Sequence, residues 1–379
     1  MEIRTIDAVP LRRELDDRFA NAQKWIDARE YCLVRIETAD GTVGWGECWG
    51  PIAGTREVID ERIAPLLSGR DAAAVESIHA DLVFDLRSAY HSTVPAGAVS
   101  GVDLALWDLR GKEAGAPAAT LLGGKRRESV PAYATGHFWP PADEFAEVKE
   151  SVVAEAESHV DAGFDALKLK IGLQRHFGWG PEYDLELVRA VRAAVGDDVA
   201  VMADANHAYD LPAARRVAEG LAEVDAAFFE EPLAPDRIDA WARLNRESPV
   251  PIAGGECWAF EPEFRRVANA GAADVLQPDV TSAGGLTSAR RAAEVGDAAG
   301  LATYPHVFGS AVALAASLQL LSTLPGSPRL EFDRTPNPIR EDLAADPIRN
   351  EGTEVPVPDG PGLGIEIDRE TLDRFRVDR

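Results

Sequence analysis

Three acidic residues recur at an even spacing in the middle of the chain. Asp204, Glu230 and Glu256 each lie 26 residues from the next, and each ends a short apolar run. One such residue alone would as readily be a solvated carboxylate at the end of a strand. Three carboxylates brought together repel one another unless a cation neutralises them, and all-oxygen ligation favours Mg²⁺ over zinc. The even spacing therefore predicts a magnesium site.

Two lysines interrupt another apolar run, "DALKLKIG". The chain contains only six lysines, and Lys168 and Lys170 are two of them. Buried ammonium groups are costly unless opposite charges compensate them, which the three carboxylates and an anionic substrate could do. Alternate side chains of a strand face the same side, so both lysines can point into one cavity. Because like charges lower the pKa of a lysine, we expect Lys168 to depress the pKa of Lys170 and make it a usable base.

A histidine and an aspartate complete the candidate chemistry. His306 alone would more often be an ordinary core histidine, but Asp279 ends the preceding apolar run and can orient its ring. His306 and the lysine pair are expected on opposite sides of the metal. Two acid/base groups beside Mg²⁺ can remove a proton α to a carboxylate, because the cation stabilises the charge that develops. The intermediate can then be reprotonated, which is racemisation, or can expel a β-leaving group, which is elimination.

The elements that position these residues follow a repeat. Short β-rich runs recur from about residue 130 onward, and alanine-rich helical patterns separate them. Eight such βα units predict a closed barrel, in which functional side chains gather at the carboxyl ends of the strands. An open doubly wound sheet would need a glycine-rich nucleotide turn after the first run, and "YATGHFW" is not one. The runs are 130–136, 165–171, 199–204, 226–231, 251–256, 273–279, 301–306 and 329–333.

The regions flanking the repeat differ from it. Residues 1–125 are predicted to form an α+β domain with a hairpin turning at Asp40-Gly41. The barrel is expected over 126–340. Residues 341–379 are turn-rich and should supply one more strand and a short helix that pack back on the first domain. The helical patterns of the first domain lie near 56–67, 73–86 and 94–114.

The amino-acid composition argues against several classes of binding partner. The 379 residues carry a net charge of −25, with 64 acidic against 39 basic residues, which argues against nucleic acid and anionic membranes. No apolar stretch suits a membrane span or a signal peptide, and three cysteines without metal-ligand spacing fit a reducing cytoplasm. We therefore expect a cytoplasmic protein. The acid excess and scarce lysine are typical of proteins from salt-loving organisms, which predicts a halophilic protein.

The motifs "KLK", "DAN", "EEP", "GGE", "QPD" and "PH", in this order and spacing, resemble the enolase superfamily in its mandelate racemase branch. The resemblance covers essentially the whole chain, including "DGTVGWGEC" and "LWDLRGK". It implies a modified (β/α)7β TIM barrel with an N-terminal α+β capping domain, within the α/β class. It also implies Asp204, Glu230 and Glu256 as Mg²⁺ ligands, with Glu231 not a ligand.

The resemblance also implies roles for the remaining site residues. Lys170 and the His306–Asp279 pair would act on opposite faces of the substrate. Lys168 and Glu331 would contact its carboxylate. A homo-oligomer acting on a small-molecule carboxylate is the expected state.

Within that branch, "YATGHF", "DANHAYD", "EFDRTPNP" and "PDGPGLGIEIDRETL" are most similar to galactarolactone cycloisomerases and acid-sugar dehydratases. The chain departs from them in the insert "LQRHFGWGPEYD". We expect β-elimination from a sugar acid or aldarolactone to a 2-keto-3-deoxy acid. A polar set at the barrel mouth would hydrogen-bond substrate hydroxyls and favours this reaction over a racemase or epimerase of a 2-hydroxy acid. That set is His137, Asn206, His207, Tyr209 and Trp139.

Two alternatives come from other classes. A Schiff-base aldolase also uses a lysine on a barrel strand, but it needs no group of three carboxylates. Borohydride with substrate, and not a chelator, would inactivate such an enzyme. A non-catalytic sugar-acid binding protein is more distant, because acid/base groups for both faces of a substrate are present.

Overall fold

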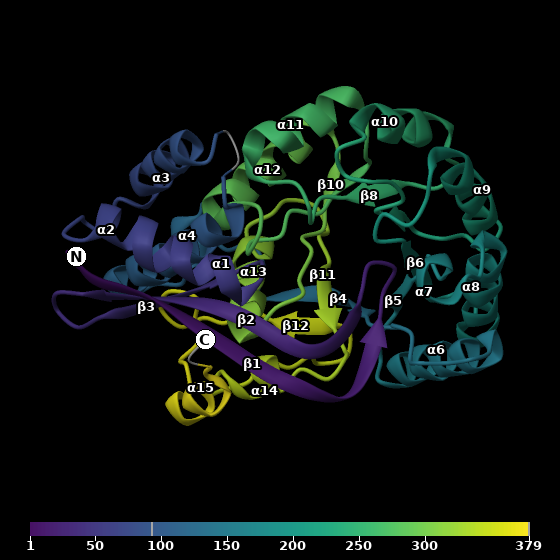
Figure 1. Cartoon of the computed structure of the whole chain (residues 1–379), viewed down its shortest axis with the longest axis horizontal. Coiled ribbons are helices and arrows are strands. Elements are labelled where there is room, and N and C mark those ends of the chain that lie inside the picture. The colour runs from purple at the N-terminus through teal and green to yellow at the C-terminus, as the bar shows by residue number, and fades with distance from the viewer. Residues whose placement is uncertain (92–93, 378–379) are drawn as a thin grey trace.

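The computed structural model describes residues 1–91 and 94–377. Its first part is an antiparallel sheet of three strands in the order β1-β2-β3 (Figure 1). The predicted hairpin at Asp40-Gly41 joins the second strand to the third, and Gly41 adopts φ 86°, which suits glycine in a tight turn. The length of the first two strands was not predicted from the sequence. They are β1 (Ile3–Ala20) and β2 (Trp25–Thr38), followed by β3 (Val43–Cys48).

The helices of this part pack on one face of the sheet. The largest contact is made by α4 (Ala96–Ala114), which comes close to β3 because Gly46 has no side chain. A Cβ atom at Gly46 would lie 1.8 Å from the main-chain oxygen of Gly101. The predicted helical patterns correspond to these elements. Before α4 come α1 (Ile52–Glu57), the π-helical segment η1 (Val58–Ile63), α2 (Ala64–Leu67) and α3 (Val75–Ala89), and after it comes α5 (Ala118–Leu121).

The second part is the predicted (β/α)7β barrel. Eight parallel strands run in the order β10-β9-β8-β7-β6-β5-β4-β11, and each predicted run overlaps one of them. In the described part of the chain, no ladder of hydrogen bonds joins β10 to β11. The strands are β4 (Ser129–Thr135), β5 (Ala166–Lys170), β6 (Ala200–Asp204), β7 (Phe229–Glu230), β8 (Ile252–Gly254), β9 (Val275–Leu276), β10 (Ala302–Thr303) and β11 (Leu330–Asp333).

Helices alternate with these strands and cover the outside of the barrel (Figure 1). Their inward faces are apolar and contribute to one continuous hydrophobic core. This core also includes the first part of the structure, residues 1–125, which is called the cap below. The insert after β5 forms a short helix and the start of the next one. The helices are α6 (Phe145–Asp161), α7 (Gln174–Phe177), α8 (Pro181–Val195), α9 (Leu211–Ala222), α10 (Ile238–Glu247), α11 (Phe260–Ala270), α12 (Gly285–Ala299) and α13 (Ala311–Leu321).

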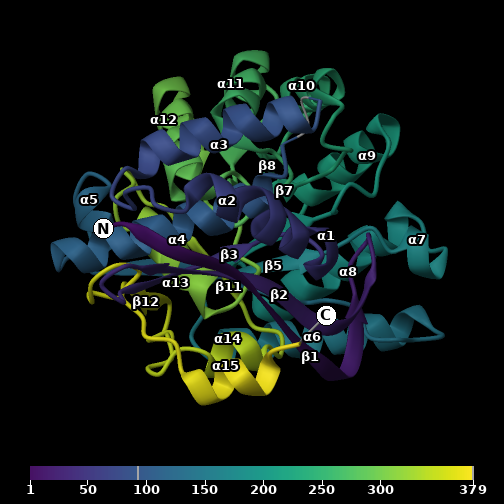
Figure 2. The same cartoon turned by 60° about the vertical axis from the view of Figure 1, so that its left-hand side comes forward.

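The last segment returns across both parts. After α14 (Pro338–Asp342), the strand β12 (Glu354–Pro356) pairs antiparallel with β4 of the barrel. The chain then reaches the cap, where the main-chain nitrogen of Leu363 donates to Asp108 over 2.9 Å. Figure 2 shows α15 (Arg369–Phe375) beside β1. Residues 378–379 of the predicted C-terminal return lie outside the described residues.

Among residues 1–91 and 94–377, none of the helices has both the length and the apolar character needed to cross a bilayer.

Candidate active site

Strand register brings the three spaced carboxylates together. Asp204 ends β6 and lies opposite Glu230, which ends β7. Glu256 follows the end of β8 by two residues. One oxygen from each of the three lies within 4.8 Å of the others. Asp204 and Glu230 are almost completely buried, and the Glu256 side chain is 12% exposed. The three evenly spaced carboxylates therefore form a cluster at the carboxyl ends of three neighbouring strands, as expected for parallel strands of a barrel.

Lys168 forms two ion pairs beside this cluster. Its Nζ is 2.6 Å from Glu230 Oε1 and 2.7 Å from Glu331 Oε1, so one ammonium group joins β7 to β11. Burial alone would lower the pKa of Lys168, but the two carboxylates outweigh burial and raise it. Glu230 also accepts a 2.5 Å hydrogen bond from Gln277 Nε2. Gln277 is the first residue of the "QPD" motif, and sequence reasoning missed its contact with the cluster.

Lys170 points to the same side of β5, as alternation predicts, and contacts Asp204 Oδ2. Lys168 does depress the pKa of Lys170, as expected, but this effect does not decide the net direction. Burial and the repulsion by Lys168 do lower the pKa of Lys170, but Asp204, with Glu331 and Glu230, outweighs them and raises it. A carboxylate in direct contact exerts a stronger field than a second lysine whose own charge is neutralised by two carboxylates.

His306 lies at the other end of the cluster. Its Nδ1 is 2.6 Å from Asp279 Oδ2, and its Nε2 is 3.1 Å from Glu256 Oε2. Burial would lower the pKa of His306, but the carboxylates of Glu256, Glu331 and Asp279 raise it to about 10. Thr281 orients Asp279, because its main-chain nitrogen and its hydroxyl each donate to Asp279 Oδ1 over 2.6 Å. The expected histidine–aspartate pair is thus formed.

A small cavity of about 50 Å³ opens between these groups and the cap. Lys170, Asn206, Glu256 and His306 line its barrel side. The cap contributes the turn between β1 and β2, which reaches over the barrel mouth near β5 and β6 (Figure 1). Ligand pockets commonly measure roughly 300–1,000 Å³, so a sugar acid can enter only if side chains or this turn move. The cap residues at the cavity are Asn21, Gln23, Lys24, Ile26 and Trp49.

Hydrogen bonds attach the turn between β1 and β2 to the barrel. The main chains of Ala20 and Trp139 exchange hydrogen bonds of 2.9 and 3.0 Å. The side chain of Gln23 lies 3.1 Å from Nδ1 of His207. Sequence reasoning did not single out Lys24, although it is one of six lysines in a strongly acidic chain. The rarity of lysine in this chain was the feature that could have marked Lys24 as a candidate site residue.

Several residues expected at the mouth have other surroundings. His137 is completely buried, and its Nδ1 donates to the main-chain oxygen of Lys168 over 2.9 Å, so the structure does not place it on the cavity as a substrate contact. The indole Nε1 of Trp139 similarly donates to the oxygen of Lys170 over 3.1 Å. Tyr209 donates to Asp184. His137 has φ 54°, a turn that no pattern of side-chain alternation could foresee.

Asn206, Glu231 and His207 lie around the carboxylate cluster. The main-chain nitrogen of Asn206 donates to Asp204 Oδ1 over 2.9 Å, and Asn206 reaches the cavity as expected. Glu231 Oε2 lies 2.6 Å from His207 Nε2. Glu231 lies outside the group that Asp204, Glu230 and Glu256 form.

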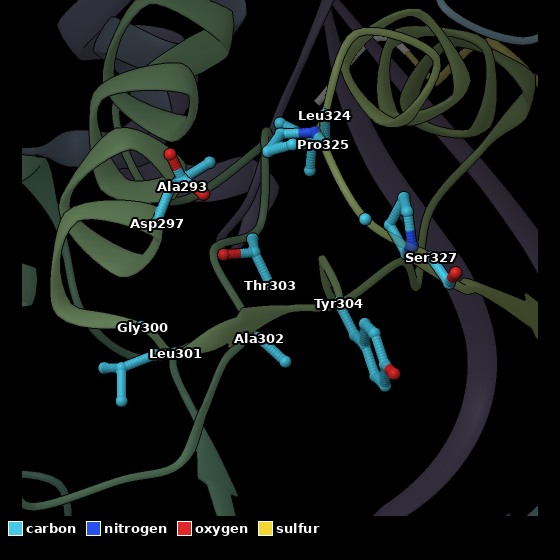
Figure 3. Close-up of a pocket in the computed structure, with 12 residues that line it drawn as sticks. Ala293, Asp297, Gly300, Leu301, Ala302, Thr303, Tyr304, Leu324, Pro325 and Ser327 are labelled. Carbon is cyan, nitrogen blue, oxygen red and sulfur yellow. The ribbon is translucent and has the colours of Figure 1, made fainter.

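A larger cavity of about 400 Å³ lies elsewhere (Figure 3). It is lined by the segments that enter β10 and β11, including Leu301, Thr303 and Pro325. This is the amino-terminal end of the barrel strands, opposite the end at which barrel enzymes hold their reacting groups. Among residues 1–91 and 94–377, no lysine or histidine lines it. The small cavity beside His306 is therefore the candidate active site.

Comparison with known proteins agrees with this geometry. Residues 151–371 match the enolase C-terminal domain-like family, and residues 8–123 match the N-terminal domain of mandelate racemase and muconate lactonizing enzyme. The D-galactarolactone cycloisomerase of Agrobacterium fabrum is 40% identical over 385 residues, covering 100% of this chain and 99% of the relative. The arabinonate dehydratase of Saccharolobus solfataricus is 32% identical, covering 95% of each.

One similar solved structure contains bound magnesium. A racemase from Streptomyces coelicolor, crystallised with bound magnesium, superposes with a TM-score of 0.86 at 30% identity. The superposition covers 99% of this chain and 100% of the racemase.

Proposed function

The chain belongs to the mandelate racemase and muconate lactonizing enzyme family of the enolase superfamily, and we propose that it removes the proton α to a carboxylate and then eliminates a β-leaving group. The substrate would be a sugar acid or an aldarolactone, and the product a 2-keto-3-deoxy acid. The observation that carries the proposal is the pairing of one acid/base group with each end of the carboxylate cluster. Lys170 contacts Asp204 at one end, and His306 contacts Glu256 at the other.

The carboxylate cluster fits Mg²⁺. Asp204, Glu230 and Glu256 offer oxygen atoms alone, within 4.8 Å of one another, and hard cations prefer such donors. Glu256 Oε2 is buried, and its 3.1 Å ion pair with His306 Nε2 is not matched by a hydrogen bond of good geometry from the described residues, so the carboxylate can also serve a cation. When bound there, Mg²⁺ would supply positive charge against the charge that develops on the substrate carboxylate.

The chain's own residues would move the protons. Lys170 or His306 accepts the α-proton in its uncharged form, which bound Mg²⁺ would favour by offsetting the carboxylates that raise both pKa values. The electron pair of the broken C–H bond forms the enediolate. That pair then forms a C=C bond as the C–O bond at the β-carbon breaks. A departing hydroxyl takes a proton from His306 Nε2 and leaves as water, whereas a lactone ring opens to a carboxylate that needs no proton. The enol produced becomes the 2-keto acid by tautomerisation.

Lys168, Glu331 and Asp279 would hold the reacting groups in place. Lys168 Nζ presents a positive charge beside Glu230 and Glu331, where a substrate carboxylate could be oriented. Asp279 Oδ2 accepts a hydrogen bond from His306 Nδ1, so Nε2 is the nitrogen directed toward the cavity. Val307 donates its main-chain N–H to Glu331 Oε2 over 3.3 Å, which links this support to the segment carrying His306.

Elimination is favoured over racemisation chiefly by the relatives' substrates. Two relatives carry the names of a galactarolactone cycloisomerase and an arabinonate dehydratase. The cavity is mixed, because Asn206 and Lys24 are polar while Trp49 and Phe138 are apolar. Its polarity therefore gives weaker support than the sequence suggested. A racemase or epimerase of a 2-hydroxy acid is the second candidate, since the same two bases could exchange a proton across the substrate.

A substrate screen tests the proposal. Mono- and diacid sugars and their lactones are incubated with the Mg²⁺-loaded enzyme, and products are read by keto-acid derivatisation and chiral analysis. Formation of a 2-keto-3-deoxy acid, lost in Lys170→Ala, is the expected result. Efficient inversion of a 2-hydroxy acid without keto product would overturn elimination. Inactivation by borohydride with substrate, and not by chelator, would instead indicate a Schiff-base enzyme.

A further inference from the structure

A second group of potential metal ligands lies outside the carboxylate cluster. Glu155 and His159 are four residues apart on α6, so their side chains share one face of the helix. His137, from the segment between β4 and α6, lies against that face. One ligand atom from each of the three lies within 4.8 Å of the others. None of these residues has a part in the mechanism above.

Two imidazole nitrogens lie at the spacing that a shared metal ion requires. His137 Nδ1 donates to the main-chain oxygen of Lys168 over 2.9 Å, and a carbonyl can only accept. The lone pair of neutral His137 is therefore on Nε2, which accepts a 3.2 Å hydrogen bond from His159 Nδ1, and a metal would take the place of that proton once it moves to His159 Nε2. Two nitrogen ligands on a tetrahedral zinc ion at ~2.05 Å lie about 3.3 Å apart. A metal-bound histidine commonly donates its other N–H to a carbonyl in this way.

Burial disfavours the charged form of both imidazoles. It lowers the pKa of His137 to about 4, and it lowers the pKa of His159 to about 4 as well. Neutral imidazole is the form that binds metal. Asp333 and Arg334 also act on His159, and their charges oppose each other there.

The carboxylate is held beside these rings. Glu155 Oε1 accepts a 3.0 Å hydrogen bond from the main-chain nitrogen of His137. Gly136 leaves room for this approach, because a Cβ atom there would lie 2.6 Å from the same oxygen. Glu155 is thus fixed by its neighbours, and a side chain at residue 136 would displace it.

We propose that His137, Glu155 and His159 form a binding site for a first-row transition metal, best suited to Zn²⁺ and separate from the carboxylate cluster. Two imidazoles with one carboxylate are a common zinc ligand set, whereas Mg²⁺ prefers oxygen alone. The metal would join α6 to the end of β4. Through His137 it would also fix the main chain of Lys168, so its role is to stabilise the segment that carries the lysines.

Zinc binding by the folded protein tests the site. Millimolar Mg²⁺ is present to occupy the carboxylate cluster, and Zn²⁺ is titrated with a chromophoric competitor. We expect about one equivalent of Zn²⁺ to bind, and His159→Gln to weaken binding at least about 100-fold, the larger end of the cost of disturbing a metal's surroundings. His176→Gln removes an imidazole elsewhere and should change nothing. Co²⁺ should give the visible absorption of a four-coordinate ion.

Further variants keep the result interpretable. Gly136→Ala retains all three ligands but displaces Glu155, and should weaken zinc binding about 10-fold or more. Glu230→Gln disables the carboxylate cluster and should leave zinc binding intact. Circular dichroism establishes that each variant is folded. The proposal is overturned if the wild type binds no Zn²⁺, if binding survives in both His159→Gln and Gly136→Ala, or if Glu230→Gln abolishes it.

Discussion

Asp184 is a buried carboxyl group that holds the chain directly after Lys170. Its Oδ1 accepts hydrogen bonds from the main-chain nitrogens of Gly172 and Leu173 over 2.8 and 3.1 Å, and its Oδ2 accepts one from the Tyr209 hydroxyl over 2.7 Å. Burial raises the pKa of Asp184 from 3.8 to about 6, even though these three hydrogen bonds lower it. The folded protein therefore carries a carboxylate that is costly to ionise.

This cost appears as a pH dependence of stability. The pKa of Asp184 is higher in the folded chain than in the unfolded chain, so the folded state binds more protons between pH 3.8 and 6. The contribution of Asp184 to stability is full below the unfolded pKa and is lost as pH rises through the folded pKa. The difference between the two pKa values corresponds to about 3 kcal/mol, an upper value because other groups relax.

Asp184→Asn isolates this effect. The amide oxygen can accept from both main-chain nitrogens, and the amide nitrogen can donate to Tyr209 once that hydroxyl turns. We expect the variant and the wild type to have similar free energies of unfolding near pH 4. Above about pH 6 the variant should be more stable, by about 1–3 kcal/mol. Urea unfolding at half-unit steps from pH 4 to 8 measures the difference.

Two outcomes would contradict this reasoning. A difference between Asp184→Asn and wild type that stays constant from pH 4 to 7 would mean that Asp184 does not titrate there. A variant that loses stability increasingly above pH 6 would mean that the hydrogen bonds favour the charged form more than burial disfavours it. Tyr209→Phe is the matched control, because it removes one hydrogen bond and leaves the carboxylate in place.

Three further predictions concern the active site and the surface. Glu230→Gln should lose most activity after dialysis against chelator and regain it only at raised Mg²⁺, so full activity in metal-free buffer would refute the ligand assignment. Lys170→Ala and His306→Asn should each lower turnover by at least about 100-fold, with solvent-deuterium exchange at the α-carbon identifying which base each face uses. Unchanged turnover and exchange in either variant would remove that residue from the mechanism. The net charge of −25 should make the thermal midpoint rise between about 0.1 M KCl, where the Debye length is ~10 Å, and a few molar, and a flat or falling midpoint would count against the halophilic expectation.

Much of the fold and the core of the site follows from the sequence. Strand and helix patterns alternate eight times, and such a series closes into a barrel whose strand ends share one mouth. A residue at the end of each strand must then lie near its counterparts on the neighbouring strands. That topological fact brings Asp204, Glu230 and Glu256 together, and alternation along β5 places Lys168 and Lys170 on one side. The local sequence pattern was sufficient to predict these positions, because every strand of the barrel ends at the same mouth.

Other features were decided by the tertiary structure alone. His137 turns inward to the Lys168 main chain because of its backbone conformation, where sequence reasoning placed it among substrate contacts. The pKa of Lys170 depends on how closely Asp204 approaches, which spacing cannot state. Lys24 reaches the cavity from a strand turn in the other domain. Regular elements follow from periodic side-chain patterns, whereas loop conformations and contacts between domains depend on packing among residues far apart in the chain, and these decide the size and lining of the cavity.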